Sequence, residues 1–178
     1  MSRLSALRDK QTQDQNILRL SYILQIIICA VGLFCLIALC SYHRTDPGFT
    51  QTKNVHVTVA NVEGYVGAWI ADFLFYFLGI NAFFVPLILC AIIWLKTHAK
   101  YYHFNLFSGV GCAFVFLSLN GLIALHVPTY HIFPAGFGGA IGEYIAWHMV
   151  EIFNVIGATF ILLTIAYCGV ILISPRFW

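Results

Sequence analysis

Seven histidines and six cysteines are the side chains in this sequence with the chemistry to bind a metal ion or carry a redox reaction. Within the pairs His98/His103 and His126/His131 the two histidines are separated by four residues, a spacing that fits part of a zinc site. No cysteine or carboxylate completes a set of four ligands, so we interpret them as loop histidines. The cysteines lie in apolar stretches without a CxxC pair, which favours structural thiols over a thiol oxidoreductase. We expect no metal and no cofactor.

Three carboxylates border apolar stretches, and a carboxylate inside hydrocarbon is a functional candidate by default. They are Asp72, Glu143 and Glu151. Asp72 fits either a proton relay or a structural residue, at a helix entry or as a hydrogen-bond acceptor between helices, and we favour the structural role. No Ser-His-Asp arrangement and no glycosidase-type pair of carboxylates emerges. A P-loop needs a lysine after glycine, whereas the four lysines follow Asp, Thr, Leu and Ala. We therefore expect no enzymatic activity of this chain.

The composition indicates which environment surrounds the protein. Hydrophobic residues make up 61% of the 178 residues and charged residues 9%, whereas soluble domains carry about 25% charged residues. A net charge of +2 excludes a strongly basic nucleic-acid binder, and 16% aromatic residues exclude disorder. The sequence predicts an all-α integral membrane protein.

Four stretches contain no Asp, Glu, Lys or Arg: Leu20–His43, Phe73–Leu95, Tyr101–Gly142 and Ile152–Pro175. A spanning helix needs ~20 apolar residues, so the first, second and fourth stretches each allow one crossing. Prolines, histidines and glycines interrupt the second half of the third stretch, which leaves one helix there. We predict a tail over 1–19 and a membrane domain over 20–178, with helices at about 20–42, 67–95, 104–125 and 152–174.

Lysines and arginines in the short loops predict the orientation, because they favour the cytoplasmic side. With both termini inside, seven of the nine lie in the cytoplasm, and the opposite topology would place seven outside. We expect a multi-pass inner-membrane protein with cytoplasmic termini and loops near 43–66 and 126–150 outside. The first outer loop contains a turn at Thr45–Gly48, and Val55–Val59 alternates like a short strand. Residues Ile141–Val150 suggest a short interfacial helix.

Two segments of the chain have similar sequences, and we call this match the internal echo. The segment from Gly64 through Gly67 and Trp69 to Ala71 aligns with the segment from Gly139 through Gly142 and Tyr144 to Ala146. Both segments precede a predicted span, which favours two helical hairpins in a parallel repeat, although a chance match in apolar sequence is the alternative. Gly109 and Ala113 form a small-xxx-small pair, which predicts a packing face on the third helix.

Three motifs resemble the N-terminal four-helix membrane domain of the FtsK/SpoIIIE family of DNA translocases. The first is Ser41-Tyr42 followed by Asp46-Pro47-Gly48-Phe49. The second runs from Gly64 through Gly67, Trp69 and Asp72 to Gly79 and Pro86, and the third runs from Pro134 through Gly139 to Gly142. The resemblance covers about residues 20–178, with the motifs in the family's order and topology.

The resemblance implies a membrane anchor and interaction domain of a DNA pump at the bacterial division septum. Its partners would be the lipid bilayer, septal membrane proteins and further copies of itself, as a hexamer by family resemblance. It implies no direct nucleic-acid binding by this chain, because the family's motor and DNA-reading domains follow the membrane domain. A small transporter or channel is the alternative, and it would need polar residues lining a cavity at mid-membrane. Phe49 lies beside the rigid prolyl turn, and it either binds other division proteins there or dips into the membrane interface as an anchor.

Overall fold

The computed structural model describes residues 2–51, 58–98, 106–128 and 132–174. Its elements are α1 (Ser2–Cys40), α2 (Gly64–Leu78), the 3-10 helix η1 (Gly79–Phe83), α3 (Phe84–His98), α4 (Leu106–His126) and α5 (Gly139–Ile173). The described part contains four helical stretches long and apolar enough to cross a membrane: Arg19–Cys40, Gly64–Trp94, Leu106–His126 and Gly139–Ile173. The predicted all-helical membrane fold is confirmed. Most of the segment Val55–Val59, predicted as a short strand, lies outside the described residues.

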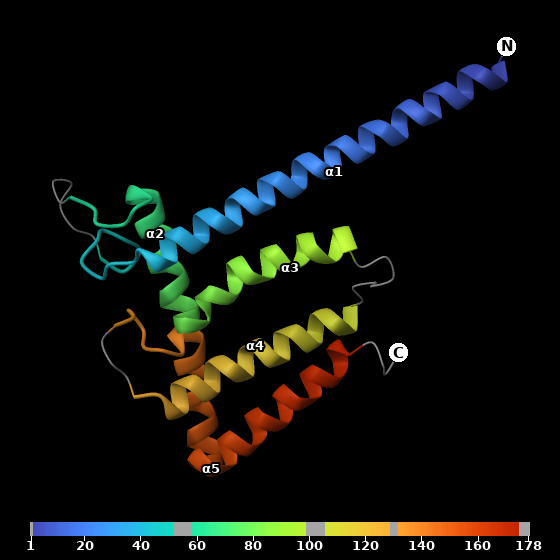
Figure 1. Cartoon of the computed structure of the whole chain (residues 1–178). Coiled ribbons are helices and arrows are strands. Elements are labelled where there is room, and N and C mark those ends of the chain that lie inside the picture. The colour runs from blue at the N-terminus through green and yellow to red at the C-terminus, as the bar shows by residue number, and fades with distance from the viewer. Residues whose placement is uncertain (1, 52–57, 99–105, 129–131, 175–178) are drawn as a thin grey trace.

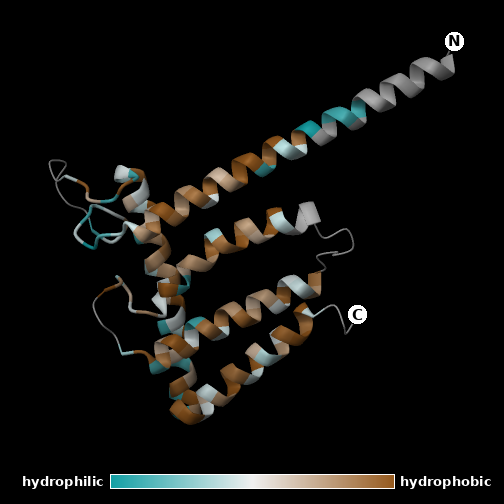
Figure 2. Ribbon diagram, viewed as in Figure 1, coloured by the Kyte–Doolittle hydropathy of each residue, from teal (hydrophilic) through white to brown (hydrophobic). Residues whose placement is uncertain are grey.

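The long helices run side by side, and two shorter helical segments cross them at one end. Figure 1 shows α1, α3, α4 and the C-terminal half of α5 alongside one another, with α2 and the first half of α5 running across them. We call this end, which also carries the described parts of the loops at 41–63 and 127–138, the loop end. The opposite end, where α1 begins and α5 stops, is the tail end. Hydropathy follows this layout, because brown apolar residues dominate the long helices in Figure 2 and teal residues gather at the loops and beyond the span of α1.

The predicted helix over 67–95 is not continuous. Gly79 ends α2 with φ 55° and ψ −140°, a conformation that strongly favours glycine. The next amide, Ile80 N–H, leaves the helical ladder and donates to the carbonyl oxygen of Phe137 at 2.9 Å. The chain turns through η1 and resumes as α3, whose first turn contains Pro86, where the missing N–H has no intrahelical partner to lose. The 15 residues of α3 rise ~22 Å, so η1 lies at the edge of the hydrocarbon layer rather than in water.

The last helix also differs from its predicted bounds of 152–174, because it begins earlier and is bent. α5 starts at Gly139 and is interrupted at Asn154, whose φ of 59° and ψ of 170° are non-helical. The side-chain Oδ1 of Asn154 accepts from the amide of Val155 at 2.8 Å. The first half of α5 therefore forms a separate segment at the loop end, and the residues after Asn154 form the fourth span.

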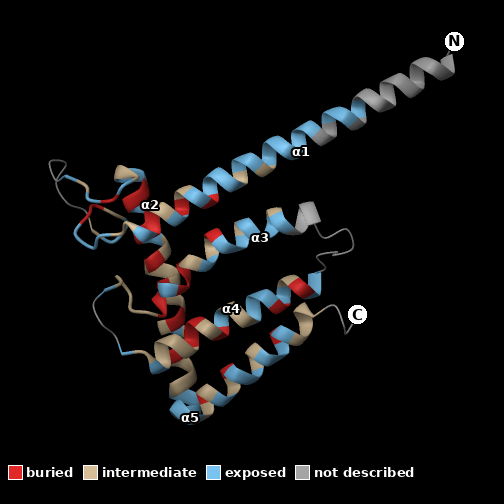
Figure 3. Cartoon of the chain, viewed as in Figure 1, coloured by how far each residue is buried: buried red, intermediate tan, exposed pale blue. Residues whose placement is uncertain are grey.

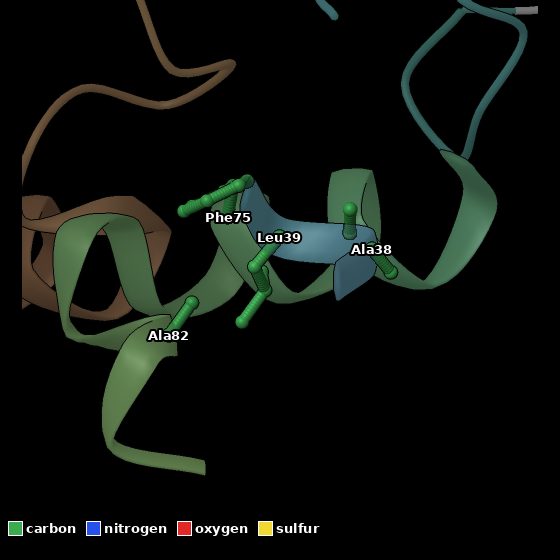
Figure 4. Packing of buried hydrophobic residues seen from close by; sticks show 5 residues of the cluster. Ala38, Leu39, Phe75 and Ala82 are labelled. Carbon is green, nitrogen blue, oxygen red and sulfur yellow. The ribbon is translucent and has the colours of Figure 1, made fainter. Parts of the chain in front are cut away.

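The buried apolar core is concentrated where α1, α2 and η1 meet. Figure 4 shows Ala38 and Leu39 of α1 against Phe75 of α2 and Ala82 of η1. Small residues on α1 and α2 allow the two helices to approach closely, as is typical of membrane helices. Figure 3 places most buried residues at the loop end, while the flanks of α1 and α3 are exposed. The flanks are apolar, so these exposed surfaces suit lipid.

α4 and α5 pack backbone to backbone. A Cβ added to Gly111 would lie 2.6 Å from the Gly169 carbonyl oxygen, and one added to Gly169 would lie 2.7 Å from that of Gly111. The sequence predicted this face at Gly109 and Ala113, but the structure places Gly109 only half-buried and Ala113 exposed. The close approach to α5 is two residues further on. Gly111 belongs to the face of α4 that carries its other buried small or polar residues, Ser108, Ser118, Asn120 and Gly121.

Candidate interaction site at the loop end

Asp46 ties the two ends of the first loop together. Its Oδ1 accepts from the amide of Ala60 and its Oδ2 from the amide of Asn61, each at 2.9 Å. The carboxylate is buried, and its own amide donates to the His43 carbonyl oxygen at 3.0 Å, which closes a turn over His43–Asp46, two residues before the predicted turn. Charge-assisted hydrogen bonds of this kind are roughly twice as strong as neutral ones, so Asp46 fixes the loop as a rigid unit.

Asp72 fastens the same loop to α2. Its Oδ2 accepts from the amide and the hydroxyl of Thr50 at 2.7 and 2.8 Å, and its Oδ1 accepts from the Tyr42 hydroxyl at 3.0 Å. Burial, together with the neighbouring Asp72 carboxylate, raises the pKa of the Tyr42 phenol above its usual range, so the phenol stays a donor. The structure thus shows Asp72 as a hydrogen-bond acceptor whose two oxygens are both engaged.

The prolyl turn lies directly on Asp72. Pro47 is buried, and a Cβ added to Gly48 would come within 2.7 Å of Asp72 Cβ and Oδ2. The Gly48 amide donates to the carbonyl oxygen of Gln51 at 3.1 Å. The first three residues of the Asp-Pro-Gly-Phe motif therefore have separate structural roles, since Asp46 closes the loop, Pro47 shapes the turn, and Gly48 allows it to touch α2.

Phe49 lies against the aromatic side chains of α2. Its ring centroid is 5.7 Å from that of Trp69, 5.4 Å from Phe73, 5.5 Å from Tyr76 and 5.9 Å from Phe77. Such edge-on and tilted pairs contribute about 0.5–1.5 kcal/mol each beyond the area that they bury. Phe49 nevertheless remains 43% exposed, so it continues an exposed apolar strip along α2. We call this strip the aromatic ridge, and its members are Phe49, Tyr65, Val66, Trp69 and Phe73.

Asn61 is a central residue that the sequence analysis missed. Its Nδ2 donates to the carbonyl oxygens of Ala38 and Ser41 at 2.8 and 3.2 Å, which satisfies the C-terminal end of α1. Its Oδ1 accepts from the Glu63 amide at 3.0 Å. A Cβ on Gly67 would lie 2.5 Å from that oxygen, so Gly67 leaves room for Asn61. A polar residue shortly before the Gly-xx-Gly motif was the available signal.

The second loop joins the first half of the chain through two glycines. Gly79 and Gly139 both have positive φ, 55° and 65°, and a Cβ on Gly79 would lie 2.5 Å from the Gly139 nitrogen. Pro134 is half-buried, in a turn closed by the Gly136 amide and the Phe133 carbonyl oxygen. The ring of Phe133 stacks on Phe75 with a centroid distance of 4.6 Å. The two halves therefore meet at the loop end.

The internal echo is visible in the backbone. Gly64 and Gly139 begin their helices with φ of 66° and 65°. Gly64 N–H donates to the Asn61 carbonyl oxygen at 3.0 Å, and Gly139 N–H donates to that of Gly136 at 3.2 Å. The side chains correspond as well. The small residues of the two motifs are buried in both halves, as the pairs Gly67/Gly142 and Ala71/Ala146 show. The aromatic residues Trp69 and Tyr144 are exposed in both halves.

The second half lacks the aspartates of the first. Gly142 packs directly on the Asn120 backbone of α4, where a Cβ would lie 2.8 Å from the Asn120 carbonyl carbon. Glu143 and Glu151 line a cleft of about 370 Å³ with Trp147 between them. The first loop is thus held by carboxylates and the second by glycine contacts, although the helices that follow have the same shape.

The polar side chains at the loop end make structural hydrogen bonds. Asp46 and Asp72 are both engaged by the first loop, and Asn120 donates to the Phe116 carbonyl oxygen of its own helix at 2.8 Å. His126 contacts the Thr159 hydroxyl at 2.8 Å, whereas His103 and His131 lie outside the described residues. No group of three or more metal-binding side chains occurs in the described ranges. The site is a rigid surface of loops and exposed aromatic rings.

These features define a polytopic helical membrane domain with four spans and a structured loop end. The model of the 4TM region of DNA translocase FtsK/SpoIIIE matches residues 19–178. The chain therefore belongs to this family of four-span membrane regions. The first span, Arg19–Cys40, begins where the match begins.

Curated relatives agree with this assignment. The chain is 32% identical over 159 residues to a DNA translocase FtsK of Shewanella oneidensis, which covers 86% of this chain and 17% of the relative. It is 32% identical over 160 residues to a DNA translocase FtsK of Pseudomonas putida, and the match covers 85% of this chain and 19% of the relative. A third, from Vibrio vulnificus, is 28% identical over 151 residues, covering 82% and 15%. The chain thus spans less than a fifth of these relatives' length, and no solved structure matches it.

Proposed function

We propose that this domain anchors a DNA translocase in the bacterial inner membrane and brings it to the division septum. The family match and the four apolar helical stretches support the anchoring part. The sequence supplies no P-loop lysine, so the motor would reside in a part of the translocase that this chain does not include. The domain itself would bind neither ATP nor DNA, and its role would be to hold the motor at the membrane.

The orientation follows from the distribution of charge. Arg19 borders the first span at the tail end, and most other lysines and arginines also lie in the segments on that side. The positive-inside tendency therefore supports a cytoplasmic tail end and an external loop end. In that orientation the aromatic ridge faces the outer membrane surface, where extracytoplasmic parts of division proteins are accessible.

The aromatic ridge is the observation that carries the recruiting role. Trp69 of α2 is 50% exposed, although its ring lies beside that of Phe49. The loop that carries Phe49 is fixed by the two buried aspartates, Asp46 and Asp72. Rigid, half-exposed aromatic side chains are favoured at interfaces because little conformational entropy is lost when they are covered. We propose that septal membrane proteins cover this ridge, and that further copies of the chain, as a hexamer, surround a common axis.

A transporter or channel has less support. Transport would require polar residues that line a cavity at mid-membrane. The groove between α3 and α4 is lined by apolar side chains. The cleft beside Glu143 and Glu151 lies at the loop end, and Asp72 is occupied by hydrogen bonds to the first loop. These contacts favour a hydrogen-bond acceptor role for Asp72 over a proton relay.

Septal enrichment of a fluorescent fusion tests the proposal. Trp69→Ser should lower the ratio of septal to lateral fluorescence several-fold, while membrane insertion and protein level stay unchanged. Tyr144→Ser is the matched control, because Tyr144 occupies the corresponding exposed position in the second half and is 66% exposed. Equal septal enrichment of both variants would contradict recruitment through the ridge. A division defect in Asp72→Asn beside a healthy Trp69→Ser would favour transport instead.

A further inference from the structure

A groove of about 400 Å³ separates the two hairpins within the membrane. It lies between α3 and α4, which make almost no contact with each other among the described residues, although α1 packs on α3 and α4 packs on α5. Its walls include Val85 and Ile88 of α3 and, on α4, the residues Cys112, Ala113, Phe116 and Leu119. All of its lining side chains are apolar.

The depth of the groove determines what can reach it. Its walls belong to spanning helices, so the surrounding medium is hydrocarbon and not water. A polar ligand or a headgroup would find no hydrogen-bonding partner there, and each unsatisfied polar group would cost several kcal/mol. Only an apolar occupant suits these walls.

The size of the groove distinguishes an acyl chain from a helix. A helix of ~10 Å diameter filling ~20 Å of membrane depth occupies roughly 1,600 Å³, which is well above the volume of the groove. An extended hydrocarbon chain is far thinner. The small side chains of Cys112 and Ala113 create this narrow space on α4, and Phe116 and Leu119 bound it.

We propose that the acyl chain of a membrane phospholipid occupies the groove between α3 and α4 as a resident lipid. The acyl chain takes the place of protein contacts that α3 and α4 do not make, so it joins the two hairpins within the membrane. Because the walls carry no polar group, recognition depends on the acyl chain, and the headgroup contributes no selectivity.

The inference is tested by counting phospholipids that remain on the purified full chain after prolonged exchange into detergent. Wild-type protein should retain a stoichiometric phospholipid, whereas Ala113→Phe, which fills the groove, should retain several-fold less. Ala91→Phe is the matched control, because Ala91 is exposed on α3 outside the groove. Cys112→Phe fills the groove from a neighbouring position and serves as the second variant if Ala113→Phe misfolds.

Three results would overturn the proposal. The first is equal lipid retention in wild type and both groove-filling variants. The second is strong selectivity when the wild-type protein is loaded from phosphatidylethanolamine or phosphatidylglycerol vesicles with identical chains, since that would require a headgroup site. The third is efficient oxidative cross-linking between the Cys112 residues of two copies in the membrane, because a second copy would then occupy the groove. Loss of septal targeting affects none of these measurements.

Discussion

Gly79 and Asn154 occupy equivalent positions in the two halves of the chain. Gly79 follows Gly64 by 15 positions, and Asn154 follows Gly139 by 15 positions. Their φ angles are 55° and 59°, and each residue ends a helical segment at the loop end before the chain turns into a span. The correspondence between the two halves therefore extends beyond Ala71 and Ala146 to the residues that end these helical segments.

The conformation of Asn154 is one that glycine adopts more easily, so Asn154→Gly should preserve or raise the stability of the domain. Asn154→Ala should lower the free energy of unfolding by about 0.5–1.5 kcal/mol, because it keeps the strained backbone and loses the hydrogen bond to Val155. Thermal unfolding in detergent gives the ranking. Gly157→Ala is the control, since only Phe153 Cβ, at 3.0 Å, approaches the added methyl group. An alanine variant at Asn154 that is more stable than the glycine variant would contradict the assignment.

Asp46 of the first loop and Asp72 of α2 should respond differently to amide substitution. Both partners of Asp46 are backbone N–H groups, which cannot become acceptors. Asp46→Asn therefore sets an amide donor against one of them and should cost about 1–3 kcal/mol. Asp72→Asn should cost less, because the Tyr42 hydroxyl can reverse and accept from the new amide.

Thermal unfolding of both asparagine variants, alongside Tyr42→Phe, measures this difference. A larger loss for Asp72→Asn than for Asp46→Asn would show that the negative charge of Asp72 matters beyond the hydrogen bonds described above. Combining Asp72→Asn with Tyr42→Phe should then cost more than either change alone, because no hydroxyl remains to accept from the amide.

The packing of α4 on α5 should depend on Gly111 and much less on Gly109. Gly111→Leu would place a side chain where even a Cβ meets the Gly169 carbonyl oxygen at 2.6 Å, so it should separate the helices and unfold or oligomerise the domain. Gly109→Leu should be tolerated, since Gly109 lies beside the packed face. Size-exclusion chromatography and thermal unfolding distinguish the two. The reverse order of severity would mean that Gly109 faces another chain in an assembly.

Orientation can be tested with a membrane-impermeant thiol reagent on intact spheroplasts. Thr58→Cys, at an exposed position of the first loop, should be labelled, and Gln13→Cys, exposed on α1 before the first span, should be labelled only after lysis. The native cysteines lie within the helical spans, so the parent protein supplies the background. Labelling of Gln13→Cys alone before lysis would invert the topology.

Hydropathy and charge were sufficient to predict the spans, because a membrane helix must be apolar along its whole length. They could not locate the bend after α2, since the stretch from Phe73 to Leu95 is apolar on both sides of Gly79 and no charge marks the turn. The Asp-Pro-Gly-Phe motif indicated a rigid loop, but the partners of Asp46 and Asp72 are mostly backbone amides, which have no sequence signature. Likewise, Gly109 and Gly111 are equally small, and only the rotation of α4 decides which one touches α5.

The near absence of contact between α3 and α4 has a mechanical consequence. The two hairpins act as stiff arms that share one pivot, formed by Gly79 and Gly139 at the loop end. A load applied at Ile173 would first enter the arm built from α4 and α5, whose backbones touch at Gly111 and Gly169 near that same end. Among the described residues the two arms contact each other through α2 and η1 at the loop end, so the tail-end spacing between α3 and α4 would be the most compliant dimension of the domain.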